Sequence, residues 1–453
     1  MKKRWLIVLL CSAVAAPAAA QTVGLQDCIE RGLKNNYSVR IVRGEEQKAR
    51  NNATIGNAGY LPTLDLSGGY SGNVNDNRNR MAADGAIEKT NGVSSQSLDA
   101  GVTLNWTVFD GLNIQAEYAR LKELRMMGEL NTRLAVEDLA AEIASEYYNL
   151  LRQKTRLRNL RATLDLSRER LRIVEAEYNI GSMSRLDLQQ AQVDFNADSS
   201  TVINQLEVLH ASHIRLNQLM AAEDVESPLP IRDSTIHPDP SLDRTDLWSS
   251  TLSSNVSLLM AQKNLQISQL DLKKARSRNY PYVRLNAGYG YNATWNGSGT
   301  IDLGQRLGLN YGITVGLNLF DGMNRRREQR NARIDIDNQQ LQIEDTRLAL
   351  QSDMSNLWMA YQNNLDLWEL EKQNVVAAQD YYSIAIDRYK LHELSGIELR
   401  EAQNSLLEAE ERLSIAEYSI KICEISLLQL SGQLLPRIFP KEGIVDAEIS
   451  PAR

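Results

Sequence analysis

Proline is scarce and unevenly placed in this chain of 453 residues. Ten prolines occur in all, and none lies in the stretches 63–227 and 282–435. Proline removes a backbone donor and clashes with the preceding helical turn, so it breaks helices. The two proline-free stretches therefore permit very long helices.

Histidine and cysteine are also rare, with four and three residues. His210 and His213 are three apart, a spacing that metals use, but no third ligand is evident, so we interpret them as helix-surface histidines. Cys28 and Cys423 lie in different halves of the chain, and the sequence leaves open whether they pair. With no phosphate loop, nucleophile elbow or His/Asp pair, we expect no catalytic residue, metal or cofactor, and an enzyme is the least expected class. A net charge of −7 argues against nucleic acid as a partner.

The first twenty residues have the pattern of a leader. Residues 2–4 are basic, residues 5–14 are apolar and residues 18–20 are alanine. This pattern predicts a secretory signal peptide over 1–20. No later run of 18 apolar residues exists, so any membrane role is expected to come from β-strands.

The chain is an internal duplication. A shift of 211 residues aligns Phe-Asp-Gly at 109–111 with Phe-Asp-Gly at 320–322, and Tyr178 with Tyr389, whereas upstream a shift of 219 aligns Pro62 with Pro281. The predicted organisation is repeat one at 21–225, a Pro-rich linker at 226–243, repeat two at 244–435 and a C-terminal tail at 436–453.

Two strands are expected in each repeat. Residues 97–109 and 307–320 alternate apolar and polar side chains, and 62–72 and 281–292 do so more weakly. Such alternation over about ten residues is typical of strands that face lipid on one side, although a half-buried sheet in a soluble domain has the same period. The expected lipid-facing residues are Val102, Leu104, Trp106, Ile313 and Val315. The polar segments 73–96 and 292–306 are expected to be external loops.

Four strands cannot close a membrane barrel, because the smallest known ones have eight. An open sheet edge in lipid leaves backbone groups unpaired. If these strands span a membrane, several copies of the chain must therefore pool them.

The remaining sequence predicts long helices. Heptad spacing of apolar residues predicts coiled-coil hairpins over 112–220 and 323–432, with a first helix of 112–180 about 100 Å long. A further helix of about 33 residues is expected to open each repeat, near 25–57 and 244–276. The aspartate of each Phe-Asp-Gly is expected to cap the helix that follows the strand.

These features together resemble the TolC-like outer-membrane efflux proteins. The resemblance rests on the duplicated plan, both Phe-Asp-Gly turns, Tyr-Asn-Ile-Gly-Ser at 178–182, Leu-Asp-Leu-Gln-Gln-Ala at 186–191 and Leu-Asn-Gln-Leu-Met at 216–220. It implies a mixed α+β membrane protein, a homotrimer whose twelve antiparallel strands form a β-barrel in the outer membrane. A coiled-coil α-helical barrel would cross the periplasm beneath it.

The resemblance also implies a function, partners and sites. The protein would be the exit duct of a tripartite efflux or type I secretion system, without catalytic activity, working with a periplasmic adaptor and an inner-membrane transporter. The implied aperture residues at the helical tips are Asp187, Glu398, Glu401 and Tyr389, and the implied adaptor-docking tip is Ile180, Gly181 and Ser182. Leu394 replaces an arginine of the family's gate, and Arg185 or Arg400 would have to compensate.

Alternatives stay open at this point. Spacing alone favours another explanation of the acids, as a solvated helix start where the helix dipole stabilises them, whereas the family resemblance favours the aperture. A stand-alone porin would need the strands but not the hairpins, and a structural envelope scaffold would need the hairpins but not the strands. Neither the substrate nor the kind of inner-membrane pump can be read from the sequence.

Overall fold

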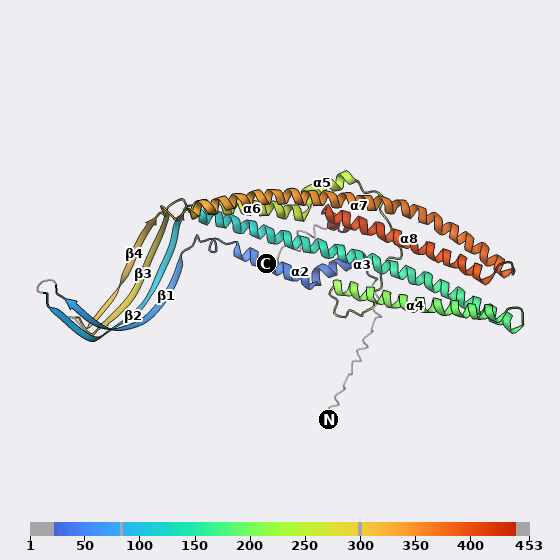
Figure 1. Ribbon diagram of the computed structural model, residues 1–453, viewed down its shortest axis with the longest axis horizontal. Coiled ribbons are helices and arrows are strands. Elements are labelled where there is room, and N and C mark those ends of the chain that lie inside the picture. Colours follow the sequence, from blue (N-terminus) through green and yellow to red (C-terminus); the bar gives the residue numbers. More distant parts are fainter. Residues whose placement is uncertain (1–21, 82–84, 298–300, 441–453) are drawn as a thin grey trace, which may run out of the picture. The chain divides into compact units, whose positions relative to one another are not determined.

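The computed structural model describes residues 22–81, 85–297 and 301–440. The predicted signal peptide and all but the first residues of the predicted tail lie outside this part. The helices are α1 Leu25–Asn35, α2 Tyr37–Asn52, α3 Asn113–Asn179, α4 Arg185–Leu219, α5 Arg244–Ser254, α6 Val256–Ser277, α7 Asn324–Lys390, α8 Gly396–Leu430 and α9 Leu434–Ile438. The strands are β1 Thr63–Arg80, β2 Ile87–Asp110, β3 Tyr282–Asn296 and β4 Leu303–Gly316 (Figure 1).

Among the described residues, no helix is both long enough and apolar enough to cross a membrane.

Two compact units make up the chain, and each contains equivalent parts of both repeats. One unit comprises the described residues up to Ile41, 135–255 and those from Leu350 onward, and the other comprises 42–134 and 256–349. We call them the helical unit and the sheet unit, because the second contains β1–β4.

The duplication extends to the helix ends. Helices α3 and α7 each have 67 residues, helices α4 and α8 each have 35, and both pairs start and end at positions related by the shift of 211. Both long helices end in the same way. The N–H groups of Gly181 and Ser182 donate to the carbonyls of Tyr178 and Glu177, and those of His392 and Glu393 make the equivalent bonds.

The helix expected to open each repeat is interrupted, which corrects the prediction of one helix of about 33 residues. The break lies at Asn36 in repeat one and at Asn255 in repeat two, both with extended ψ values. The Asn36 amide donates to the Leu219 carbonyl at 2.9 Å, and the Asn255 amide donates to the Leu430 carbonyl at 3.0 Å. Each asparagine thus satisfies a carbonyl at the end of a returning helix, a tertiary contact that local periodicity does not reveal.

The sheet is antiparallel in the order β1-β2-β3-β4. Trp106 lies opposite Leu285, which lies opposite Ile313, so apolar residues of three strands share one row. The adjoining row, on the other face, holds Thr107, Arg284 and Thr314. The register therefore gives the sheet one apolar face and one polar face, as the alternation predicts.

The strands are displaced from the expected bounds at three places. β3 continues to Asn296 and β4 begins at Leu303, so most of the loop expected at 292–306 is paired strand. β1 and β2 continue as a paired ribbon to Arg80 and Ile87, through residues expected to form a loop, because backbone pairing needs no apolar alternation. β4 ends at Gly316, although the alternation runs on to Leu319 and the predicted strand extends to Phe320. Gly316 pairs with Tyr282, and the residue before Tyr282 is Pro281, which has no N–H to continue the ladder.

Both Phe-Asp-Gly turns join a strand to a long helix, as expected. Asp110 accepts the N–H of Ile114 at 3.1 Å, and Asp321 accepts the N–H of Arg325 at 3.0 Å. Gly111 has φ 71°, and a Cβ there would lie 2.2 Å from the carbonyl oxygen of Ser277. Glycine is therefore required at this turn both for its backbone conformation and for the close approach.

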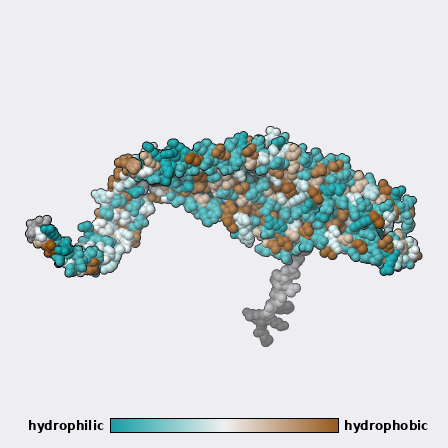
Figure 2. All heavy atoms as spheres, viewed as in Figure 1, coloured by the Kyte–Doolittle hydropathy of each residue, from teal (hydrophilic) through white to brown (hydrophobic). Residues whose placement is uncertain are grey.

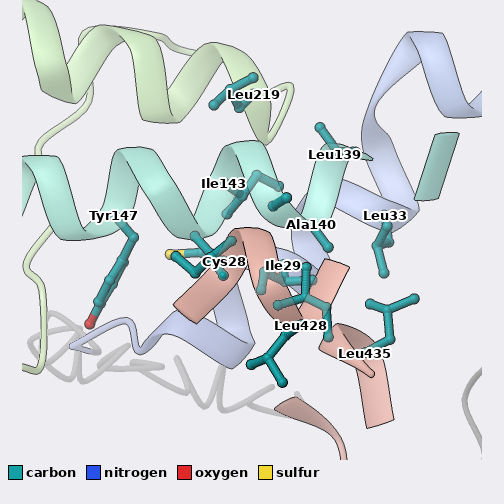
Figure 3. Packing of buried hydrophobic residues seen from close by; sticks show 14 of the residues in the cluster. Cys28, Ile29, Leu33, Leu139, Ala140, Ile143, Tyr147, Leu219, Leu428 and Leu435 are labelled. Carbon is teal, nitrogen blue, oxygen red and sulfur yellow. The ribbon is translucent and has the colours of Figure 1, made fainter. Parts of the chain in front are cut away.

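The helical unit has an apolar core built from both repeats (Figure 3). Tyr147, Ile143 and Leu216 are fully buried in it, and each aliphatic side chain contributes about 1.5–3 kcal/mol by leaving water. The Pro-rich segment packs onto this core, because Tyr147 donates its hydroxyl to Asp233 at 2.6 Å and Val23 forms a parallel bridge with Ile231. The linker is thus attached to the helices along its length.

Candidate functional site

The two hairpin tips make the same left-handed turn with different residues. Gly181 has φ 84°, and its counterpart His392 adopts φ 58°, a left-handed conformation that disfavours a side chain. Ile180 is 80% exposed beside Gly181, and the Ser182 hydroxyl is bonded to the Glu177 carbonyl. The predicted docking tip is therefore an open turn with a projecting apolar side chain.

Two of the predicted aperture acids form capping boxes. Asp187 accepts from the N–H and hydroxyl of Ser184, and Glu398 does the same with Ser395. The hydrogen bonds from Ser395 hold the pKa of Glu398 below its usual range. Glu401 is exposed and has no partner among the described residues. Asp187 and Glu398 thus start their helices, the structural role that the sequence left open.

Tyr389 and Leu394 lie in a small apolar cluster at the tip of the second hairpin. Both pack against the buried residues Ala385, Leu399 and Ala402. Burial raises the pKa of the Tyr389 hydroxyl, with the nearby Arg170 acting in the opposite direction. Leucine in place of the family's arginine therefore contributes packing here and no ion pair.

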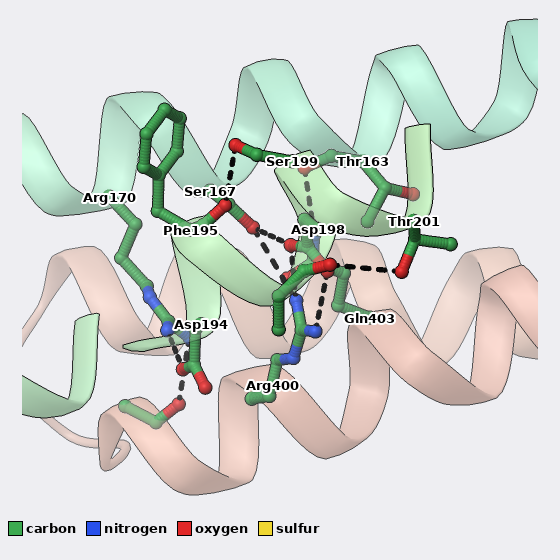
Figure 4. A network of polar contacts seen from close by, with 12 residues as sticks. Thr163, Ser167, Arg170, Asp194, Phe195, Asp198, Ser199, Thr201, Arg400 and Gln403 are labelled. Atoms are coloured by element: carbon green, nitrogen blue, oxygen red, sulfur yellow. Dashed lines mark hydrogen bonds and ion pairs between the residues drawn. The ribbon is translucent and has the colours of Figure 1, made fainter. Parts of the chain in front are cut away.

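A buried ion pair joins the two hairpins next to this cluster, because Arg400 lies between Leu399 and Ala402 on α8 (Figure 4). The Arg400 guanidinium on α8 donates to both carboxylate oxygens of Asp198 on α4, each at 2.7 Å. Ser167 on α3 donates its hydroxyl to the same carboxylate. The side chains of Arg400 and Asp198 are 20% and 10% exposed, and the Asp198 carboxylate raises the pKa of Arg400.

A second set of contacts lies beside the first. Arg170 on α3 forms an ion pair with Asp194 on α4 and donates to the carbonyl of Gly396, the first residue of α8, at 3.3 Å. Gln403 on α8 donates to the Thr163 carbonyl on α3 at 3.2 Å. We call these residues the hairpin tie: Thr163, Ser167, Arg170, Asp194, Asp198, Arg400 and Gln403 (Figure 4).

The hairpin tie occupies positions where a coiled coil usually has apolar side chains. Along α3 the buried positions continue at spacings of three and four through Ser167 and Arg170 to Val174. A buried charge in such a position destabilises the protein unless it has a partner. Arrangements of α8 that separate the charges are therefore disfavoured, and these contacts specify how α8 packs against α3 and α4. The Arg400–Asp198 pair joins the two hairpins directly, and hydrogen bonds from Arg170 to Gly396 and from Gln403 to Thr163 support it.

Sequence reasoning named Arg400 only as one possible substitute and missed the rest of the tie. Comparison of the repeats holds the signal, because positions equivalent to Arg170, Asp198 and Arg400 carry Tyr381, Ala409 and Gln189. Two of these charges lie in repeat one and the third lies in repeat two, and none has a charged counterpart in the other repeat. They therefore mark a contact that the duplication does not generate twice within one chain. Arg185, the other suggested substitute, has no ion pair among the described residues.

The other candidate groups form no site. In the described part of the chain, no group of three metal-ligating side chains comes together. His213 has its pKa lowered by burial, whereas His210 is exposed on the same helix. Cys28 and Cys423 are free thiols in the core, and burial raises the pKa of Cys28 to about 12.

Comparison with known proteins gives a consistent result. The sequence profile of the family described as outer membrane efflux protein matches residues 28–222 and 247–433. The chain belongs to the outer membrane efflux protein family. The two matched ranges correspond to the two repeats, so both copies carry the family's pattern.

Relatives in this family cover most of the chain. The outer membrane efflux protein BepC of Brucella suis biovar 1 (strain 1330) is 20% identical over 94% of this chain and 89% of its own length. The proteases secretion protein PrtF of Dickeya chrysanthemi is 23% identical over 71% of this chain and 70% of its own length. The crystal structure of the Campylobacter jejuni CmeC outer membrane channel superimposes with a TM-score of 0.74 at 17% identity, covering 90% of this chain and 86% of CmeC. Family membership places the protein in the outer membrane and shows the TolC-like fold.

Proposed function

We propose that this outer-membrane efflux protein is the exit duct of a tripartite efflux or secretion system, and that the hairpin tie keeps its periplasmic end closed. Membership of the channel family carries the first part. The bidentate Arg400–Asp198 pair, buried between α8 and α4, carries the second. The named relatives include both an efflux protein and a secretion protein, so the cargo class stays open.

The duct is proposed to be a homotrimer. β1 and β4 each pair on one side only, and three copies of the four-stranded sheet would close a twelve-stranded barrel without free edges. A stripe of α7 supports contact with a second copy. Ile334, Leu341 and Leu348 are seven residues apart and are all exposed in the single chain. The apolar face of the sheet, with Val102, Leu104, Trp106, Ile313 and Val315, would then meet lipid.

The gate is proposed to act at the hairpin tips. In the closed state the hairpin tie holds α8 against α3 and α4, and Asp187, Glu398 and Glu401 contribute rings of carboxylate to the aperture in a trimer. Such rings favour cations. Tyr389 packs the second tip beneath them.

Opening is proposed to follow contact of a periplasmic adaptor with Ile180, Gly181 and Ser182. The exposed isoleucine and the open glycine turn suit an apolar contact with a partner. An adaptor that binds only the separated hairpins would offset the cost of breaking the tie. An inner-membrane transporter would supply the cargo and the energy.

Conductance of the purified protein in planar bilayers tests this function. We expect a low resting conductance that rises when the adaptor is added, and a cation preference that weakens in the variant Glu398→Gln/Glu401→Gln. A resting protein that is fully open, or one that never conducts with or without the adaptor, would contradict the proposal. Replacing Ile180 by Ser should abolish the adaptor's effect and leave the resting conductance unchanged.

A further inference from the structure

In the sheet unit, exposed apolar side chains gather at the end of the sheet where its strands join α6 and α7. Leu319 is 85% exposed and Phe320 is 72% exposed in the segment after β4, and Met323 follows in the same turn. Tyr280, in the turn before β3, is exposed as well. Figure 2 shows a hydrophobic patch at this turn beside a strongly hydrophilic patch over the start of α7.

The hydrophilic patch is basic. The segments 271–284 and 318–333 contain ten Lys and Arg residues and three acids, in a chain whose net charge is −7. The three acids are already paired. Glu328 pairs with Arg278, Asp321 with Arg325 at 3.3 Å, and Asp271 with Arg120 at 3.0 Å.

Of the seven exposed cations without an ion-pair partner among the described residues, Arg284 lies on β3 over the Tyr282 ring, and the other six lie on α6 and α7. They are Lys273, Arg276, Arg326, Arg327, Arg330 and Arg333. Positive charge of this density repels itself, so it is costly unless anions gather near it.

The four of these cations that lie on α7 point in two directions, which are set by the side of α7 that packs on α6. Arg325 and Gln329 face α6, because they donate to the carbonyls of Arg278 and Ala275 at 3.2 and 3.3 Å. Successive helical residues turn by about 100°, so Arg327 and Arg330 lie opposite α6, on the stripe proposed to meet a second copy. Arg326 and Arg333 lie on a flank between these two sides.

On α6, two residues face neither neighbouring helix. Lys274 pairs with Glu117 on α3, and Ala275 meets α7, whereas Lys273 and Arg276 are exposed between these contacts. We call Lys273, Arg276, Arg326 and Arg333 the basic collar.

The fold itself does not require the collar. The first repeat makes the same strand-to-helix turn and keeps a cation, Lys122, only at the position equivalent to Arg333. The positions equivalent to the other three, Lys273, Arg276 and Arg326, carry Thr54, Asn57 and Gln115. Helix α3 therefore starts without these cations. Their presence in only one repeat indicates a ligand that this side of the molecule meets.

We propose that the basic collar binds the phosphate groups of anionic phospholipids in the leaflet that faces the periplasm. The inference rests on the proposed function, in which the sheet spans the outer membrane and its helical end lies at the periplasmic surface. Leu319 and Phe320 would then lie at the edge of the hydrocarbon, with the cations one helical turn further out, at the depth of the headgroups. Guanidinium groups bind phosphate through paired hydrogen bonds, and basic residues beside an apolar segment are attracted to anionic lipid.

Native mass spectrometry of the purified protein in micelles tests the collar, with phosphatidylglycerol and phosphatidylcholine added in competition. We expect the wild type to retain phosphatidylglycerol preferentially, and to lose this preference at high salt. The variant Lys273→Thr/Arg276→Asn/Arg326→Gln copies the first repeat. Each cation near an anionic surface changes binding about fivefold, so the preference should fall about a hundredfold.

A matched control is Arg327→Ala/Arg330→Ala, which copies Ala116 and Ala119 of the first repeat and removes a similar charge from the other side of α7. It should keep the lipid preference. An unchanged preference in the triple variant would overturn the proposal, and so would an equal loss in the control. Dissociation of the triple variant into single chains would show instead that the collar contacts a second copy. Failure of the proposed function would be seen separately, as a wild-type protein that does not conduct.

Discussion

Replacing Asp198 by Asn should open the duct at rest. The substitution keeps the size of the side chain and one acceptor oxygen, but it removes the charge that both Arg400 nitrogens contact at 2.7 Å. Arg400 then loses its anionic partner in the closed state. In the proposed open state the pair is already separated, so the substitution costs little there.

The size of the effect follows from burial. Breaking a fully buried pair costs about 3–5 kcal/mol, and breaking an exposed pair costs about 0.2–1 kcal/mol. With side chains 20% and 10% exposed, the Arg400–Asp198 pair lies between these limits, at about 2 kcal/mol. Three protomers that open together would shift by about 6 kcal/mol, and about 5.5 kcal/mol is enough to turn a channel from 1% to 99% open.

Single-channel recording in planar bilayers measures this shift directly. Glu169→Gln is the matched control, because Glu169 also pairs with an arginine on α3 but is exposed to solvent. The control should behave as the wild type, and the exchange Asp198→Arg/Arg400→Asp should restore closure. If Asp198→Asn assembles normally and its open fraction equals that of the control, the hairpin tie does not hold the tips.

Three further predictions concern the rest of the chain. Val102→Arg or Ile313→Arg should destabilise the assembled protein by about 2–4 kcal/mol, whereas Thr103→Arg or Thr314→Arg should be mild, and equal losses of heat-stable trimer on gels would show that the sheet does not face lipid. Gly111→Ala should prevent assembly, because the new Cβ would meet the Ser277 carbonyl, whereas Gly322→Ala should cost only about 1–2 kcal/mol for its left-handed backbone, and equal trimer yields would refute the contrast. Burial raises the pKa of Glu424, although the nearby Lys421 acts in the opposite direction. The folded protein therefore binds this proton more tightly than the unfolded chain does, and its free energy of unfolding falls as pH rises from the unfolded pKa to the raised pKa. Thermal midpoints should therefore show Glu424→Gln gaining on the wild type between about pH 4 and about pH 7, and a constant difference would contradict this reasoning.

The helical hairpins and the strand faces were predictable, because both depend on local periodicity. Heptad spacing placed α3 and α4 within a residue or two of their observed ends, and period-two alternation identified the rows of Trp106 and Ile313. The Phe-Asp-Gly caps followed from the chemistry of one side chain. The TolC-like family was also predicted correctly from the ensemble of these features.

The features that sequence reasoning missed depend on contacts between distant segments. The breaks at Asn36 and Asn255 exist because each amide reaches a carbonyl at the end of another helix. The ribbon beyond Asn73 pairs by backbone alone, so its side chains show no alternation. The hairpin tie joins α3, α4 and α8, and only the side-by-side placement of these helices shows that Asp198 and Arg400 are partners.

The roles of Asp187, Glu398 and Glu401 at the aperture remain predictions, since their rings would form only between copies of the chain. Within one chain the first two serve as capping residues. A helix start and an aperture ring are compatible, because a carboxylate bonded to backbone N–H groups keeps its charge. The sequence could not separate the two roles.

The mass of the protein extracted from the outer membrane, cross-linked in mild detergent, tests the central claim most directly. A duct built from four strands per chain requires partners for the free edges of β1 and β4. We predict a mass of three subunits, unchanged in Asp198→Asn because the hairpin tie lies within one chain. A stable single chain in the membrane would contradict the account, because its sheet edges would then be unpaired in lipid.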